Sequence, residues 1–449
     1  MSAQICQQKF NNILQFICKM IIMYGMDIKI TPKNNISGKI AVPGDKSISH
    51  RALILGAIAE GITEIEGFLP GEDCLATIDC LRKLGVRIEH SGDVVRIFGV
   101  GLHGLKKPAD TLYVGNSGTT LRLLTGLLAG QGFDATLDGD ASIRKRPMDR
   151  VIQPLSQMGA KISGSHAPIT IKGAKLRGIH YKMPINSAQV KSAILLAALY
   201  AQDGDTTVVE ELSIGAARNH TEKMMAHMGI CLDISGKIIK YAGGVPGGRK
   251  ISVPGDISSA AFFIVAGTLM AENGFMIKNV GINPTRTGLI DALRQMGAQI
   301  VISKPRILGT EEAGDIFVAK SALRAIKLKG DIVLRMIDEI PIFAVAALFA
   351  GGTTVIKDAE ELAVKESNRI TAMSSQLAKM GAVIGARHDG MIIHGGTTLN
   401  GAVVDSHSDH RVAMALAIAA VVANGETTIK NAHCVAISFP DFFHILDSF

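Results

Sequence analysis

Apolar stretches of helical length alternate with shorter, strand-like stretches along the whole chain. In six places an apolar run ends in small residues and a glycine, and alternating apolar and polar residues follow, as expected where a helix leads into a strand. The six glycines are Gly61, Gly132, Gly204, Gly274, Gly352 and Gly425, and the intervals between them are 71, 72, 70, 78 and 73 residues. Such regular spacing predicts one structural unit that is repeated six times.

A second marker recurs inside five of these units, where an amphipathic pattern ends at an apolar residue followed by glycine. The pairs are Leu84-Gly85, Met158-Gly159, Met228-Gly229, Met296-Gly297 and Met380-Gly381. Glycine at this position is typical of a helix C-cap, and an alternating strand pattern follows each pair. Each unit is therefore predicted to run strand, helix, strand, helix, strand, strand, with its helices on one face of its strands, which makes the fold class α/β.

Two Val-Pro-Gly-Asp segments, at 42–45 and 253–256, divide the chain. A chain of 449 residues exceeds one ordinary core, so two domains of three units each are expected. If the N-terminal strand joins the second half, the chain crosses between domains twice. Domain one then comprises 26–45 and 256–449, domain two comprises 46–255, and the crossings can act as hinges. Residues 1–25 are expected to be an extension outside the fold, too short and too polar to span a bilayer.

Hydroxyl, amide and basic residues gather where the long apolar helices are predicted to begin. At the first helices they are Lys46, Ser47 and Arg51; 116–120 with Arg122; 187–191; 256–259; Asp338 and Glu339; and 408–411. At the second helices they are 144–147, 218–220, 285–287 and 365–369. A helix N-terminus favours an anion by about 0.3–1 kcal/mol, although ordinary capping explains any single case equally well. Because similar units place these ends at the same edge, the pattern favours a cleft that binds polyanionic small molecules.

Two acidic residues interrupt this basic pattern. Asp338 precedes an apolar helix, and Glu366 lies between Lys365 and Arg369. Each carboxylate can simply cap its own helix. In a cleft that binds anions, however, a carboxylate repels the ligand, so its presence there indicates general acid or base chemistry.

Composition narrows the class of function. The formal net charge is +7, but aromatic residues are only 4% of the chain and no block of five Lys or Arg occurs, which favours small anionic substrates over nucleic acid. The six cysteines have no metal-ligand spacing, as expected of a reduced cytoplasmic protein without a structural metal. Gly44-Asp45-Lys46-Ser47 lacks the first glycine of a phosphate-binding loop, so nucleotide hydrolysis is disfavoured.

Seven motifs, in order and covering residue 26 to the end, resemble those of the 5-enolpyruvylshikimate-3-phosphate synthase family. They lie at 43–51, 116–119, 145–148, 187–192, 337–341, 364–369 and 409–411. The resemblance implies a two-domain inside-out α/β barrel with three βαβαββ units per domain. It implies transfer of the enolpyruvyl group of phosphoenolpyruvate to the 5-hydroxyl of shikimate 3-phosphate, with release of phosphate, through a tetrahedral intermediate. The expected protein is a cytoplasmic monomer of chorismate and aromatic amino acid biosynthesis, with no cofactor, metal, nucleic-acid or membrane partner.

The resemblance also implies site residues. The expected contacts to shikimate 3-phosphate are Lys46, Ser47, Arg51, Ser187, Ala188, Gln189 and Lys365. The expected contacts to phosphoenolpyruvate are Lys46, Gly118, Arg146, Gln189, Arg369 and Arg411, and Asn116 and His410 complete the substrate-binding set. Lys46, Asp338 and Glu366 are the expected catalytic residues. Asp338 would accept the proton of the 5-hydroxyl and Glu366 would protonate the methylene carbon, although which carboxylate handles which proton stays open.

Some positions depart from the family pattern or bear on rival functions. Ile437 stands where one branch of the family has lysine, so a helper cation is not expected there. Gly118, where a tolerant variant carries alanine, predicts inhibition by glyphosate. The enolpyruvyl transferase that acts on UDP-N-acetylglucosamine differs by Lys-Asn in place of Lys46-Ser47 and by a reactive loop cysteine. A non-catalytic anion- or nucleic-acid-binding protein is the other alternative, and it would have no use for Asp338 and Glu366.

Overall fold

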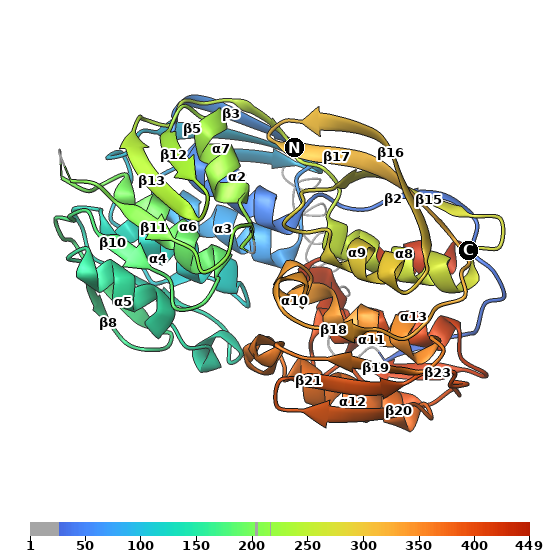
Figure 1. Cartoon of the computed structure of the whole chain (residues 1–449). Helices are drawn as coiled ribbons and strands as arrows, with labels where there is room; N and C mark the ends of the chain where they lie inside the picture. Colours follow the sequence, from blue (N-terminus) through green and yellow to red (C-terminus); the bar gives the residue numbers. More distant parts are fainter. Residues whose placement is uncertain (1–26, 203–204, 216) are drawn as a thin grey trace, which may run out of the picture.

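The computed structural model describes residues 27–202, 205–215 and 217–449, and these form two bodies that lie side by side (Figure 1). The predicted extension 1–25 and the repeat glycine Gly204 fall outside the described residues. The architecture is mixed α/β with several separate sheets. No helix in the described part of the chain is long and apolar enough to cross a membrane.

The body drawn in blue to green in Figure 1 contains three four-stranded sheets. The first has the order β14 (Lys250–Ser252), β3 (Glu60–Glu66), β5 (Val94–Val100), β4 (Arg87–Ser91), with helices α2 (Lys46–Ala57) and α3 (Glu72–Lys83). The second has the order β6 (Leu112–Tyr113), β7 (Ala135–Asp138), β9 (Ile169–Lys172), β8 (Lys161–Ser163), with α4 (Gly118–Ala129), η1 (Ile143–Lys145) and α5 (Asp149–Gln157). The third has the order β10 (His180–Lys182), β11 (Val208–Glu210), β13 (Ile238–Gly243), β12 (Cys231–Ser235), with α6 (Ala188–Ala198) and α7 (His220–His227).

The body drawn mainly in yellow to red contains two four-stranded sheets and one three-stranded sheet. The fourth sheet has the order β16 (Gln299–Leu308), β17 (Glu311–Ala319), β15 (Phe275–Gly281), β2 (Gly38–Ala41), with α8 (Ile257–Met270) and α9 (Gly288–Gln295). The fifth has the order β18 (Lys327–Leu328), β19 (Thr353–Ile356), β21 (Gly390–His394), β20 (Val383–Arg387), with α10 (Asp331–Arg335), η2 (Ile337–Glu339), α11 (Ile340–Leu348), η3 (Glu360–Val364) and α12 (Arg369–Lys379). The sixth has the order β1 (Ile28–Ile30), β23 (Thr427–Lys430), β22 (Val403–Asp405), with α13 (His410–Val421), η4 (Ala432–Ile437) and α14 (Phe442–Asp447).

The four-stranded sheets share one strand order. In the second sheet β6 is parallel to β7, β7 is antiparallel to β9, and β9 is antiparallel to β8. A parallel pair needs a long crossover, and the helix between its two strands supplies it. The sixth sheet differs from the predicted unit, because β1 pairs antiparallel with β23 and the chain continues into η4 and α14 in place of a second strand pair.

The helices α8, α11 and α13 are almost wholly buried, and they form much of the core of the yellow-to-red body. Every residue of α11 and α13 is buried, as is almost all of α8. A helix that is hydrophobic all round must be enclosed by other elements, which here are helices and the inner faces of the sheets. One core cluster lies within residues 48–253, and the other combines residues 30–42 with residues 257–446.

The chain passes between the bodies at the two Val-Pro-Gly-Asp segments. Strand β2 precedes α2 but pairs in parallel with β15, whereas β14 precedes α8 but pairs in parallel with β3. The two halves therefore exchange their leading strands. Glycine is required at the first crossing, because a Cβ on Gly44 would lie 1.8 Å from the carbonyl oxygen of Gly67.

Helix ends follow the predicted pattern at both termini. The five predicted C-cap glycines all have positive φ, from 88° at Gly85 to 101° at Gly297. The side chains of Asp45, Ser117, Ser187, Asp256, Asn368 and Asp409 accept hydrogen bonds from the first turns of their helices. Ordinary capping is therefore real at these positions. It does not explain Asp338 or Glu366, because α11 has no side-chain cap and Asn368 caps α12.

Candidate active site

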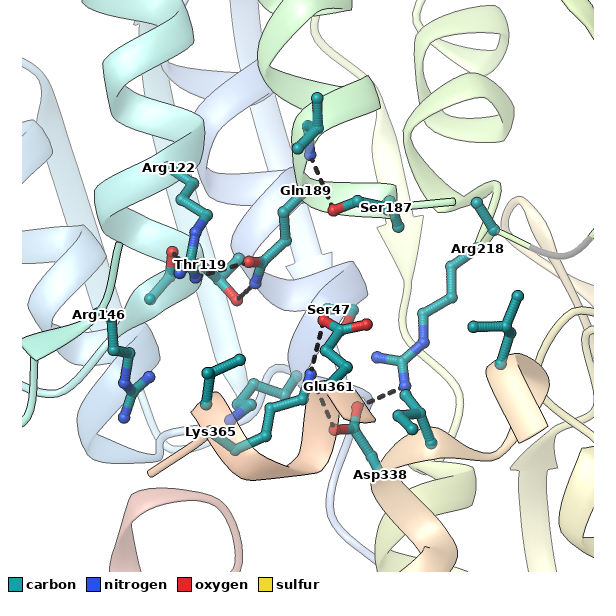
Figure 2. A pocket seen from close by; sticks show the side chains of 18 of the residues that line it. Ser47, Thr119, Arg122, Arg146, Ser187, Gln189, Arg218, Asp338, Glu361 and Lys365 are labelled. Carbon is teal, nitrogen blue, oxygen red and sulfur yellow. Dashed lines mark hydrogen bonds and ion pairs between the residues drawn. The ribbon is translucent and has the colours of Figure 1, made fainter. Parts of the chain in front are cut away.

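A cavity of about 190 Å³ lies where the two bodies face each other, and Figure 2 shows the side chains that line it. The starts of α2, α4 and α6 form one wall, and η2, the turn after η3 and the start of α13 form the other. Twelve predicted site residues line it: Lys46, Ser47, Arg51, Gly118, Arg146, Ser187, Ala188, Gln189, Asp338, Lys365, Glu366 and Arg411. Repeated units thus bring residues from 46 to 411 to one place.

Three predicted residues lie behind the wall rather than on it. Asn116 accepts a hydrogen bond from Arg146 at 2.8 Å and donates one to Asp140 at 2.6 Å, so it orients that arginine. Arg369 is buried because its guanidinium is held by Asp409 at 2.8 Å and by Glu366 at 2.6 Å. His410 is buried as well. The side chains of these three residues therefore do not reach the cavity wall, where a substrate would contact them.

Other wall residues were not among the predicted catalytic and substrate-binding residues. They are Asp73, Thr119, Arg122, Pro147, Arg150, Asn186, Val190, Ala217, Arg218, Asp256, Arg286, Leu334, Ile337, Glu361 and Val364. Seven of them belong to the predicted helix-start pattern, although no role was assigned to them: Thr119, Arg122, Pro147, Val190, Arg218, Asp256 and Arg286. Asp73 carries no such signal, because an acidic residue in the first turn of a helix is ordinary. Ile437, where a helper cation was not expected, is buried in η4 and does not line the cavity.

Asp338 stands at the centre of a cluster of cations. Arg218 of the opposite body contacts its Oδ2 at 2.5 Å, Arg369 contacts its Oδ1 at 3.3 Å, and Lys365 lies 3.9 Å away. Burial disfavours the charged carboxylate, but Arg411, Arg218, Lys365 and Arg369 outweigh it and hold the pKa of Asp338 well below its ordinary value. The carboxylate is therefore ionised at neutral pH and able to accept a proton.

Glu366 is the second carboxylate of the wall. Its Oε2 accepts from Arg369 at 2.6 Å, and its Oε1 lies 3.6 Å from Arg146. Burial again opposes ionisation, but Arg369 and Arg146 keep the pKa of Glu366 well below its ordinary value. Nearby His410 has its pKa lowered well below the ordinary value, first by burial and then by Lys46, so its ring is neutral at pH 7.

Lys46 reaches the cavity from the first residue of α2, and its Nζ lies 3.1 Å from Asp73 on α3. Burial lowers the pKa of Lys46, but Asp73 more than offsets this, and the net shift is upward. Burial raises the pKa of Asp73 despite the lysine. The contact with Asp73 therefore fixes the charged ammonium group of Lys46 at one point of the wall.

Cations outnumber acids around the cavity, where nine Lys and Arg face five carboxylates. Arg51 forms no ion pair with a carboxylate of the described residues, and it donates to Thr221 at 2.6 Å, to Ser192 at 2.8 Å and to the Ser47 carbonyl. Arg122 donates to Gln189 at 2.8 Å, as Figure 2 shows. Burial lowers the pKa of each arginine to about 10, so both stay charged at neutral pH. Unneutralised buried cations of this kind are suited to polyanions.

Among the described residues, the one cluster with metal-ligand spacing comprises Glu360, His388 and Asp389. Its members are exposed or half-buried, and they do not line the cavity. The cavity wall itself offers nine cations and five carboxylates, which are groups suited to binding anions and to transferring protons.

Comparisons with known proteins agree with this chemistry. The family model described as EPSP synthase (3-phosphoshikimate 1-carboxyvinyltransferase) matches residues 30–446. The 3-phosphoshikimate 1-carboxyvinyltransferase of Thermoanaerobacter sp. (strain X514) is 56% identical over 426 residues, which cover 94% of this chain and 100% of the relative. That of Geobacillus kaustophilus (strain HTA426) is 53% identical, covering 93% and 99%. The solved structure of EPSP synthase from Acinetobacter baumannii is 44% identical, with a TM-score of 0.83 and coverage of 94% and 98%.

Proposed function

Because the chain belongs to the EPSP synthase (3-phosphoshikimate 1-carboxyvinyltransferase) family, we propose that its cavity transfers the carboxyvinyl group of phosphoenolpyruvate to shikimate 3-phosphate. The bond between the enol carbon and the phosphate oxygen breaks, a bond from that carbon to the 5-hydroxyl oxygen forms, and phosphate leaves. One observation carries the proposal: Lys46, Arg146, Asp338, Glu366 and Arg411 share one cavity although they come from both bodies.

The two ligands divide the wall by charge and position. Shikimate 3-phosphate is assigned to the blue-to-green body, where Ser47, Arg51 and the start of α6 at 187–189 lie together. Phosphoenolpyruvate is assigned to Lys46, Arg146 and Arg411, beside Gly118, with Arg369 behind. Each phosphate brings a charge of about −1.5 to −2, so together the ligands supply the anions that balance the surplus cations.

Asp338 and Glu366 are assigned the proton transfers. Glu366 protonates the methylene carbon of phosphoenolpyruvate, positive charge develops on the adjacent carbon, and the 5-hydroxyl attacks there as Asp338 takes its proton. The tetrahedral intermediate then returns a methyl proton to the Glu366 carboxylate, the bond between its central carbon and the phosphate oxygen breaks, and phosphate leaves. Because the pKa of Glu366 is well below its ordinary value, this residue is ionised in the cavity and needs a proton before it can act as the donor. Bound phosphates that engage Arg369 and Arg146 would raise the pKa of Glu366 and favour its protonated form.

The finer architecture belongs to the same proposal. The shared strand order of five sheets supports five βαβαββ-like units, and with the shorter sixth sheet we assign them to a two-domain inside-out α/β barrel. The two separate cores and the exchanged strands support domains of 26–45 with 256–449 and of 46–255. We assign the protein to the cytoplasm as a monomer, with the two small molecules as its partners and neither nucleic acid nor membrane.

Phosphate release is the direct test. Purified protein is incubated with phosphoenolpyruvate, with and without shikimate 3-phosphate, and inorganic phosphate is measured over time. Release that requires shikimate 3-phosphate supports the proposal. Release that requires UDP-N-acetylglucosamine in its place would assign the rival transferase activity, and binding of either ligand without any release would leave an anion-binding protein.

A further inference from the structure

The two Val-Pro-Gly-Asp crossings contact each other directly beneath the cavity. Gly44 and Gly255 form an antiparallel bridge. The backbone N–H of Asp45 donates to the carbonyl of Pro254 at 2.9 Å, and that of Asp256 donates to the carbonyl of Pro43 at 2.8 Å. The place where the chain changes bodies is therefore a short two-stranded contact with one aspartate on each strand.

Both aspartates cap helices, and one of them also caps across the bodies. Asp45 accepts from the N–H of Ile48 at 2.9 Å, at the start of α2, and Asp256 Oδ1 accepts from the N–H of Ser258 at 2.8 Å, at the start of α8. The other oxygen of Asp256 accepts from the backbone N–H of Lys46 at 3.2 Å. The first residue of α2, whose side chain lines the cavity, is thus held by a carboxylate of the other crossing.

Arg286 joins these two carboxylates. It precedes α9, its side chain is 2% exposed, and its Nη1 lies 3.1 Å from Asp45 while its Nη2 lies 3.3 Å from Asp256. Nη2 also donates to Ser258 at 2.7 Å. A planar guanidinium can serve two carboxylates and a hydroxyl from fixed directions, whereas an ammonium cannot reproduce that fork.

The same arginine is linked to the catalytic side of the other wall. The hydroxyl of Ser258 donates to Glu339, the residue after Asp338 in η2. Arg411 lies 3.7 Å from the same Glu339 and 3.8 Å from Asp338. A continuous set of contacts therefore runs from the Lys46 end of α2, through Asp256, Arg286 and Ser258, to the segment that carries Asp338.

We propose that Arg286 is a positioning residue for the transfer reaction: it fixes the Lys46 end of α2 relative to the segment of Asp338 across the crossing between the bodies. This inference rests on the proposed function. It assigns no substrate contact to Arg286, which acts through Asp256 and Ser258. Misplacing reacting groups by about 1 Å can cost on the order of a hundredfold in rate, so a loosened link should appear in kcat.

Two variants each loosen the link in a different place. Arg286→Lys keeps the positive charge but loses the fork. Asp256→Asn keeps an oxygen for the N–H of Ser258, but its amide NH₂ faces the N–H of Lys46, so the cap across the bodies is lost while α8 stays capped. The control is Arg294→Lys on α9, because within the described part of the chain that guanidinium donates only to the carbonyl of Ile300.

The measurements are kcat for phosphate release, Kd for shikimate 3-phosphate by calorimetry, and circular dichroism to confirm folding well below the melting temperature. We expect at least a tenfold fall in kcat for Arg286→Lys and for Asp256→Asn. The Kd should stay within threefold, because the shikimate 3-phosphate residues other than Lys365 all lie in one body. Arg294→Lys should match the wild type. The double variant Arg286→Lys/Asp256→Asn should be no slower than the slower single variant, since both changes break one link.

A folded Arg286→Lys or Asp256→Asn protein with wild-type kcat would overturn the inference. Loss of shikimate 3-phosphate binding in step with kcat would also overturn it, because that result indicates general damage to the fold. If Arg286→Lys does not fold, Asp256→Asn decides alone. A wild-type protein that releases no phosphate with both substrates would refute the proposed function itself, and this outcome is separate from any result with the variants.

Discussion

Replacing Asp338 by asparagine tests the proposed proton acceptor most directly. The amide has the same shape as the carboxylate but no negative charge, and it cannot take up the proton of the 5-hydroxyl. A positioned general base contributes about 10²–10⁴-fold to a rate, or about 3–5 kcal/mol of the barrier. We therefore expect kcat for phosphate release to fall by at least about a hundredfold.

The affinity for shikimate 3-phosphate should not fall in this variant, although kcat does. In the free protein Asp338 neutralises Arg218, Arg369 and Arg411, which lie 2.5, 3.3 and 3.8 Å from its oxygens. Asparagine leaves these cations without their counterion, so a phosphorylated ligand meets a more positive cavity. The Kd of shikimate 3-phosphate should stay the same or decrease, whereas loss of a residue that binds substrate would increase it.

The assay pairs steady-state phosphate release at saturating substrates with calorimetric titration of shikimate 3-phosphate. The control is Asp134→Asn, which removes an exposed carboxylate that only accepts from the backbone of Gly173. Wild-type values are expected for the control in both measurements. A kcat for Asp338→Asn within tenfold of wild type would refute the role as base, and loss of shikimate 3-phosphate binding would show that Asp338 holds the substrate.

Three further predictions concern individual residues. Glyphosate should inhibit phosphate release, and inhibition of the Gly118→Ala variant should require at least about tenfold more glyphosate, with the Kd of shikimate 3-phosphate unchanged. The reason is that the new Cβ would lie 2.7 Å from Arg122 and 3.1 Å from Arg146 and must displace those guanidinium groups. Equal inhibition of the two proteins would contradict this prediction. Burial opposes ionisation of Asp45, but Arg286, His220, the N–H of Ile48 and Arg218 together outweigh burial and lower the pKa of Asp45 to about 2. The stabilisation is present above pH 4 and is lost as the pH falls toward 2, so Asp45→Asn should reduce the difference in urea-unfolding free energy between pH 6 and pH 3 by about 1 kcal/mol; an unchanged difference would count against the pairing. In a Cys6→Ser/Cys18→Ser variant, iodoacetamide should label the exposed Cys231 first, without loss of activity. Burial raises the pKa of the Cys80 and Cys434 thiols to about 12, so these two should react more slowly. Inactivation in step with labelling of Cys231 would indicate a catalytic thiol.

Periodicity made most of the site predictable. Each unit repeats the same order of elements, so a polar group at one helix start implies polar neighbours at the equivalent helix starts. Residues as distant in the sequence as Ser47 and Arg411 do line the same cavity. The predicted C-cap glycines at positions such as Gly85 and Gly297 are confirmed by their positive φ for the same reason. Polar residues and glycines that recur at regular spacing can therefore be recognised from one amino-acid sequence.

Contacts made only in the tertiary structure were not predictable. Asp73 meets Lys46 because α3 packs beside α2, and nothing in the first turn of α3 distinguishes this acid from a residue that favours the helix dipole. The pairing of β14 with β3 is of the same kind, since it joins strands about 190 residues apart. The sixth sheet broke the repeat because β1, from the far end of the chain, pairs with β23.

The contacts of buried Arg369 show how the positive charges beside the cavity are balanced by carboxylates. Its guanidinium contacts Asp409, Glu366 and Asp338, so three carboxylates hold one arginine that was expected to meet phosphoenolpyruvate. A buried cation needs counterions, and with no ligand bound the acids proposed to transfer protons supply them. A phosphate arriving at Arg146 or Arg411 would take over part of that task and leave Glu366 less strongly held in its charged form. Capping, ion pairing and proton transfer thus use the same side chains, which is why residues that look like ordinary helix ends can also be the ones that carry the chemistry.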